Sequence, residues 1–84
     1  MSKNSFEQSV LTVAQAIHNQ RKGKSITQQQ MALKLGVDQA VISRIENAEQ
    51  IPSDEILCKL TKLLNFEIVK TFNKRGEVRI EIRH

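Results

Sequence analysis

The sequence predicts a mainly α-helical protein of four to five helices followed by a β-hairpin or strand pair. One observation behind this prediction is that apolar residues recur at three- and four-residue steps through most of residues 6–64, as on one face of a helix. The other is that apolar and polar residues alternate through most of residues 66–83, as along a half-buried strand. We therefore expect a helical domain over residues 1–65 and β-strands over residues 66–84.

The length and composition of the chain limit what it can do. Its 84 residues, 39% hydrophobic and 26% charged, fit one small folded domain, so a deep enzymatic cleft is not expected. No apolar stretch approaches the roughly 18 residues that cross a bilayer, and the first residues do not resemble a signal peptide. We expect a cytoplasmic protein with no membrane partner. The formal net charge of +4 favours a polyanionic partner, although it would also suit a merely soluble surface.

The residue types that carry chemistry suggest no cofactor. His18 and His84 have no Cys, His or carboxylate partners at ligand spacing, so no metal site is expected. No nucleophile–base pair or phosphate-binding glycine loop occurs, so we expect no enzymatic activity. Cys58 lies within an apolar helical pattern and is expected to be buried.

The first half of the chain predicts three helices. The first runs from Phe6 to Arg21 and is followed by a basic, glycine-containing loop over residues 21–25. Thr27 can cap a second helix over residues 28–35, and Gly36 suits the left-handed turn that ends it. Asp38 can cap a third helix that ends at about Asn47. The apolar residues expected to face the core here are Met31, Ala32, Leu35, Ile42 and Ile45.

Polar and small residues occupy the opposite side of the third helix. They are Gln39, Ala40, Ser43 and Arg44, and the helical spacing predicts that they face outward. A fourth helix is predicted after Pro52, with Ser53 as its cap and Leu64 near its end. The outward residues of the third helix are the first candidates for a functional surface.

Two strands are predicted after the fourth helix. The second of them would place Val78, Ile80 and Ile82 on one face and charged residues on the other. An isolated hairpin is marginal in water, so this apolar face must pack on the chain's own helices or on a second copy. We favour the second alternative, in which these three residues form a dimerisation element.

Residues 27–47 have the layout of a helix-turn-helix: two short helices joined by a turn at Gly36, with small Ala32 where they cross. Within this stretch, the segments from Thr27 to Val37 and from Ile42 to Asn47 resemble the XRE family of phage Cro and C1-type repressors, which have a lambda-repressor-like domain. The resemblance covers about residues 6–65. One departure is Ala48, where many members carry glycine, so the loop before Pro52 is expected to take a different course.

The resemblance implies a role for individual residues on duplex DNA. Gln39, Ala40, Ser43 and Arg44 would contact base edges, since the second motif helix enters the major groove in this family. Two alternatives stay open here: Arg44 holds a phosphate instead of a base, and Ser43 faces solvent. Gln28 and Asn47 would contact phosphates, and Lys22 and Lys24 would add non-specific attraction. Family members often pair an arginine at the place of Arg21 with a glutamate at the place of Glu46, so this pair is expected to form a partly buried ion pair.

The function implied by the resemblance is sequence-specific repression of transcription by a homodimer on a palindromic operator. A short repressor with strands after the fourth helix is also similar to the HipB-like antitoxins of type II toxin-antitoxin operons, which implies autoregulation and a toxin partner. Two alternatives stay open at this stage. One is a stand-alone phage or plasmid repressor, and the other is a protein-interaction adaptor that uses the same fold.

Overall fold

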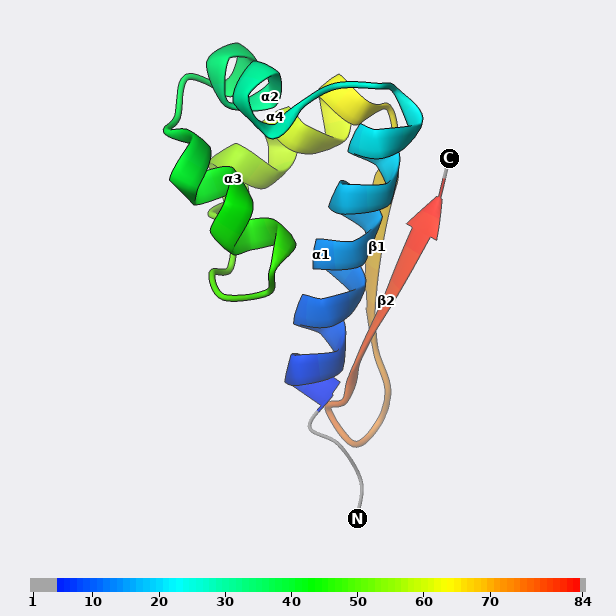
Figure 1. Cartoon of the computed structure of the whole chain (residues 1–84). Coiled ribbons are helices and arrows are strands. Elements are labelled where there is room, and N and C mark those ends of the chain that lie inside the picture. Colours follow the sequence, from blue (N-terminus) through cyan, green and yellow to red (C-terminus); the bar gives the residue numbers. More distant parts are fainter. Residues whose placement is uncertain (1–4, 84) are drawn as a thin grey trace.

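The computed structural model describes residues 5–83, and side chains for residues 8–77 and 79–83. The chain order is four helices and then two strands (Figure 1). Their bounds are α1 Ser5–Gly23, α2 Gln28–Leu35, α3 Gln39–Glu46, α4 Asp54–Leu64, β1 Glu67–Phe72 and β2 Val78–Arg83. The predicted fold class, mainly helical with a C-terminal strand pair, is confirmed. The Val78 side chain, whose orientation was predicted, falls outside the described side chains, and His84 lies outside the described residues.

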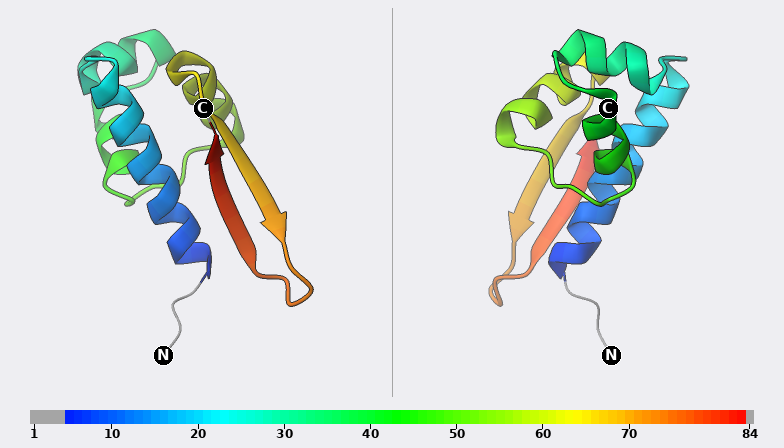
Figure 2. Two further views of the ribbon diagram at one scale, coloured as in Figure 1. Left: turned by 90° about the vertical axis from the view of Figure 1, so that its right-hand side faces the viewer. Right: turned by 60° about the vertical axis from the view of Figure 1, so that its left-hand side comes forward.

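The elements are arranged around α1. Helices α2, α3 and α4 gather on one side of it (Figure 1), and the hairpin of β1 and β2 runs alongside it in both views of Figure 2. The two strands are antiparallel neighbours, and β2 is the strand that contacts α1. The hairpin therefore packs on the helices of its own chain.

The core contains residues from all four helices. Its largest fully buried side chains are Ile17, Met31, Ile42, Ile45, Leu60 and Leu64. Phe66, which links α4 to β1, is also buried and belongs to the same cluster. Burying such apolar side chains contributes roughly 1.5–3 kcal/mol each, so this cluster fixes how α2 and α3 sit on α1 and α4. The residues expected to be buried in the second and third helices are all in this core.

The helix ends follow local chemistry. The Thr27 hydroxyl accepts a hydrogen bond from the backbone N–H of Gln30, whose side chain in turn accepts from the backbone N–H of Thr27, a reciprocal cap. Gly36 ends α2 in the left-handed region, with a φ of 73°. Ser53 caps α4 through its hydroxyl. Asp38 occupies the N-cap position of α3, but its side chain makes no capping hydrogen bond, contrary to the prediction.

Two further predictions about the helices are wrong. Helix α1 continues through Arg21 and Lys22 to Gly23, where a loop was expected, because Arg21 is buried against the other helices instead of lying in a basic loop. Cys58 is exposed. It lies on the side of α4 that also carries Glu55 and Lys62, three and four residues away, whereas Leu60 and Leu64 take the buried side.

The register of the hairpin decides which residues face the helices. Ile68 pairs with Ile82, Lys70 with Ile80 and Phe72 with Val78. Ile68, Lys70, Phe72, Ile80 and Ile82 therefore share one face of the two-stranded sheet. Ile68 and Ile82 pack against the core cluster. The strands thus pair within the chain, and Ile80 and Ile82 are half-buried on its own helices. The expected role of this face in dimerisation stays a prediction.

Candidate nucleic-acid interface

Helix α3 presents one side to the core and the other to solvent. Ile42 and Ile45 are buried, three residues apart, and hold the helix against α2. Gln39, Ala40 and Arg44 are exposed on the remaining surface, and Ser43 is half-buried. The helix is eight residues long and begins three residues after the turn at Gly36. The structure therefore leaves the amide group of Gln39 and the guanidinium group of Arg44 accessible to base edges when α3 lies in a DNA major groove, which is wide enough to admit a helix.

The guanidinium group of Arg44 is held by the loop that follows α3. Its Nε donates a hydrogen bond of 2.9 Å to Oε1 of Gln50. This bond uses the one N–H on the inner edge of the guanidinium and leaves the two terminal NH₂ groups for a bidentate contact to guanine or phosphate. Gln50 was missed by sequence reasoning. Its only sequence signal is a polar side chain in the loop directly after the third helix.

The loop after α3 turns at Ala48. This residue has a φ of 59°, in the left-handed region that favours glycine. The backbone N–H groups of Ala48 and Glu49 donate to the carbonyls of Ile45 and Arg44, which closes the end of the helix. The alanine adopts the conformation that glycine enters at lower cost.

A buried carboxylate connects α3 to α1. The side chain of Glu46 is 2% exposed and lies 2.6 Å from Nε of Arg21, which itself is buried. Nη2 of Arg21 donates to the second carboxylate oxygen at 3.0 Å, so the contact is bidentate, and Nη1 donates to the carbonyl of Ile26. The structure thus brings together the two residues expected to pair.

Two further groups complete the surroundings of this carboxylate, and neither was predicted to be there. Nδ1 of His18 lies 2.8 Å from Glu46, and the Gln28 side-chain amide donates to it over 3.3 Å. Burial alone would raise the pKa of Glu46, but hydrogen bonds from Arg21, His18 and Gln28, with the charge of Arg21, outweigh it and lower the pKa. Glu46 is therefore ionised at neutral pH and links α1, α2 and α3.

The residues expected to contact phosphates are distributed over three segments. Lys22 and Lys24 are exposed at the end of α1 and in the connection to α2. Asn47 is exposed at the C-cap of α3. Gln28, at the start of α2, directs its amide toward Glu46 and is half-buried, so a phosphate contact by this side chain requires it to leave or share that bond.

Two other features, a metal cluster and a membrane-spanning helix, are not found in the described part of the chain. No group of three or more metal-ligating side chains comes together in this part of the chain. Within the same residues, no helix has the length and apolar character to span a membrane.

The fold and the exposed α3 define a helix-turn-helix protein. Comparison with protein families agrees, since the model of a helix-turn-helix family matches residues 17–70. The chain therefore belongs to this family of DNA-binding transcription regulators, of XRE type.

The chain is similar to parts of two known proteins. Over 57 residues, 68% of the chain, it is 37% identical to "Vegetative-specific protein H7" of Dictyostelium discoideum, covering 55% of that protein. Over 52 residues, 62% of the chain, it is 35% identical to the "ImmF control region 10 kDa protein" of Bacillus phage phi105, covering 58% of that protein. The matches thus span little more than half the length of either relative.

Proposed function

We propose that this protein is a transcriptional repressor that binds a pseudo-palindromic DNA operator as a homodimer, with α3 in the major groove. One observation carries the proposal: burial of Ile42 and Ile45 leaves Gln39, Ala40 and Arg44 together on the solvent side of a short helix that follows a tight turn. Gln39 suits a bidentate contact to adenine, Arg44 one to guanine, and Ala40 a thymine methyl group.

The fixed orientation of α3 supports this role. Contacts to base edges require that the helix enters the groove at a defined angle, and the bidentate bond between Arg21 and Glu46 ties α3 to α1. Lys22 and Lys24 lie exposed at the end of α1 and in the connection to α2, where they would add attraction to phosphates that weakens with salt.

Two biological roles are compatible with such a repressor: an antitoxin and a stand-alone repressor. The resemblance to HipB-like antitoxins favours an autoregulatory antitoxin with a toxin partner, whereas the similarity to a phage control-region protein supports a stand-alone phage-type repressor. The two roles share the same DNA-binding step. A neighbouring gene whose product forms a stable complex with this chain would favour the antitoxin, and the lack of such a complex would favour the stand-alone repressor.

The experiment that tests the proposal is selection of binding sites from random duplex DNA, followed by titrations of the selected site at several salt concentrations. We expect one enriched sequence with two inverted half-sites. Lys22→Ala should weaken binding to all sequences alike and reduce the salt dependence by about one unit of slope, whereas Arg44→Ala should lose about 1–3 kcal/mol at particular base pairs if it contacts bases. Gln29→Ala, on exposed α2 surface, is the matched control. Failure to enrich any sequence at physiological salt would contradict the proposal and favour the adaptor alternative.

A further inference from the structure

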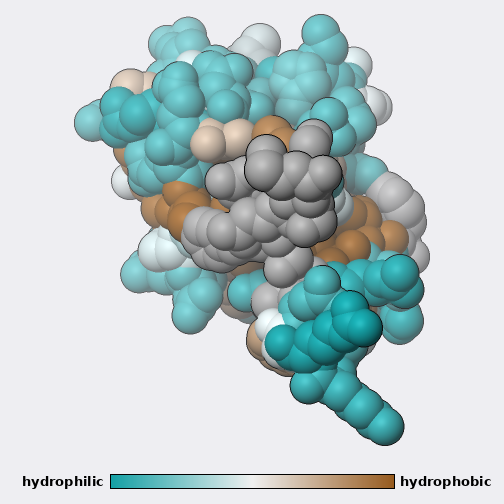
Figure 3. Space-filling model, turned by 90° about the horizontal axis from the view of Figure 1, so that it is seen from below, coloured by the Kyte–Doolittle hydropathy of each residue, from teal (hydrophilic) through white to brown (hydrophobic). Residues whose placement is uncertain are grey.

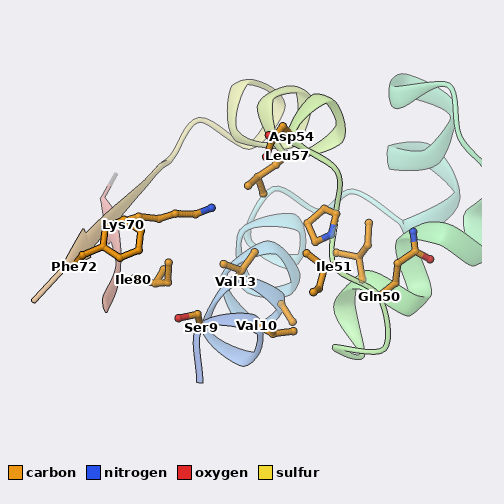
Figure 4. Close-up of a pocket in the computed structure, with 13 residues that line it drawn as sticks. Ser9, Val10, Val13, Gln50, Ile51, Asp54, Leu57, Lys70, Phe72 and Ile80 are labelled. Carbon is orange, nitrogen blue, oxygen red and sulfur yellow. The ribbon is translucent and has the colours of Figure 1, made fainter. Parts of the chain in front are cut away.

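An apolar groove lies on the side of the molecule where the hairpin meets α1. It has a volume of about 230 Å³ and runs between α1, the loop after α3, the start of α4 and the hairpin (Figure 4). Its main apolar lining residues are Val10, Val13, Ile51, Leu57, Phe72 and Ile80. Seen from below, the molecule carries apolar patches among hydrophilic surface (Figure 3).

Two large apolar side chains at this groove are exposed. Phe72 is 69% and Ile51 56% exposed. The register places Phe72 on the same hairpin face as Ile80, so its ring belongs to the groove side and not to the charged outer face of the sheet. Exposed large apolar residues beside an apolar groove are typical of an interaction surface, since covering them removes apolar area from water.

The charges at the groove indicate what covers it. Asp54 and Lys70 both line it, one from α4 and one from β1 (Figure 4), and among the described residues no ion pair joins them. Lys70 interrupts the otherwise apolar inner face of β1, between Ile68 and Phe72. A surface that carries one acid and one base is complementary to a second copy of itself turned about a two-fold axis, because each base then meets the other copy's acid.

We propose that this groove is an isologous interface for a second copy of the chain, in which Phe72 of each copy packs into the groove of the other and Lys70 faces Asp54 of the partner copy. The inference rests on the proposed function, which requires a dimer, and it assigns the surface. The sequence pattern predicted dimerisation through Val78, Ile80 and Ile82 of the second strand. The interface proposed here is the whole groove instead, because Ile82 already packs against the core of its own chain.

The groove also adjoins the candidate DNA-contacting residues. Gln50 lines the groove and at the same time accepts the hydrogen bond from Arg44. A second copy packed on Ile51 would therefore hold the loop that orients Arg44. Dimer formation and DNA contact are thereby coupled through one side chain.

Sedimentation equilibrium of the full chain without DNA tests the interface. We expect a concentration-dependent dimer, and Phe72→Glu should raise its dissociation constant at least about tenfold, because it places a charge in an apolar contact. Thr71→Glu is the matched control, since Thr71 is exposed on the opposite face of the same strand, and it should change the constant less than about threefold. Circular dichroism verifies that both variants are folded.

Charge reversal tests the orientation. Asp54→Lys and Lys70→Glu should each weaken the dimer, and the double variant should restore most of the loss, because the pair is reversed as a whole. A wild-type chain that stays monomeric at all concentrations, a Phe72→Glu variant that dimerises normally, or a double variant without recovery would each overturn the proposed interface. Binding-site selection separates this failure from failure of the proposed function, since a protein that dimerises elsewhere still enriches an inverted repeat.

Discussion

Replacing Glu46 with glutamine should destabilise the protein strongly. Glu46→Gln keeps the size of the side chain and removes the charge that faces the buried Arg21. Breaking a buried ion pair from one side costs about 3–5 kcal/mol, because the remaining charge stays buried without a partner. His18, whose side chain is 46% exposed, borders the pair on one side and lets water approach. We therefore expect a loss at the lower end, about 3 kcal/mol.

The assay is denaturant unfolding followed by circular dichroism, with thermal unfolding as a second measurement. A loss of this size lowers the melting temperature of a domain of this length by more than about 10 °C. Glu49→Gln is the control, because Glu49 is exposed in the loop after α3 and should change the free energy of unfolding by less than about 0.5 kcal/mol. A loss below about 1 kcal/mol for Glu46→Gln would refute the argument that this ion pair holds α3 on α1.

Three further predictions follow from the same region. The lowered pKa of Glu46 means that its ionised form stabilises the fold above its ordinary value of 4.5 and that this stability is lost as the pH falls through the lowered pKa. The difference in unfolding free energy between wild type and Glu46→Gln should therefore shrink as the pH falls from neutral through this lowered pKa, and a difference that keeps its neutral-pH size throughout the acid range would contradict this. Ala48→Gly should stabilise the chain by about 0.5–1 kcal/mol, because relief of the left-handed alanine exceeds the added entropy of the unfolded chain, and a loss in denaturant unfolding would contradict it. Gln50→Ala should weaken operator binding in the wild type but not in an Arg44→Ala background, and equal losses in both would show that Gln50 does not act through Arg44.

Local sequence patterns predicted the helical part of the fold well. The three-residue spacing of Ile42 and Ile45 gave the buried side of α3, and the left-handed preference of glycine gave the turn at Gly36. Thr27 and Ser53 cap their helices as expected, because a side-chain oxygen next to free backbone N–H groups acts within a few residues.

Contacts between distant parts of the chain were less predictable. His18 and Gln28 surround Glu46 from 28 and 18 residues away, and periodicity carries no information about such a meeting. Cys58 was expected inside because it neighbours leucines in sequence, but its position on α4 places it with the charged side. The hairpin register likewise places Lys70 and Phe72 on the groove side of the sheet, and alternation alone does not fix that register.

The central claim is that the solvent side of α3 contacts base edges, and base preference measures this most directly. Fluorescence anisotropy titrations of wild type and Gln39→Ala against the selected operator and all its single-base-pair variants give the preference at each position. The account predicts that Gln39→Ala loses about 1–3 kcal/mol of discrimination at one base pair in each half-site and keeps the others. An equal loss of affinity on every variant would contradict it.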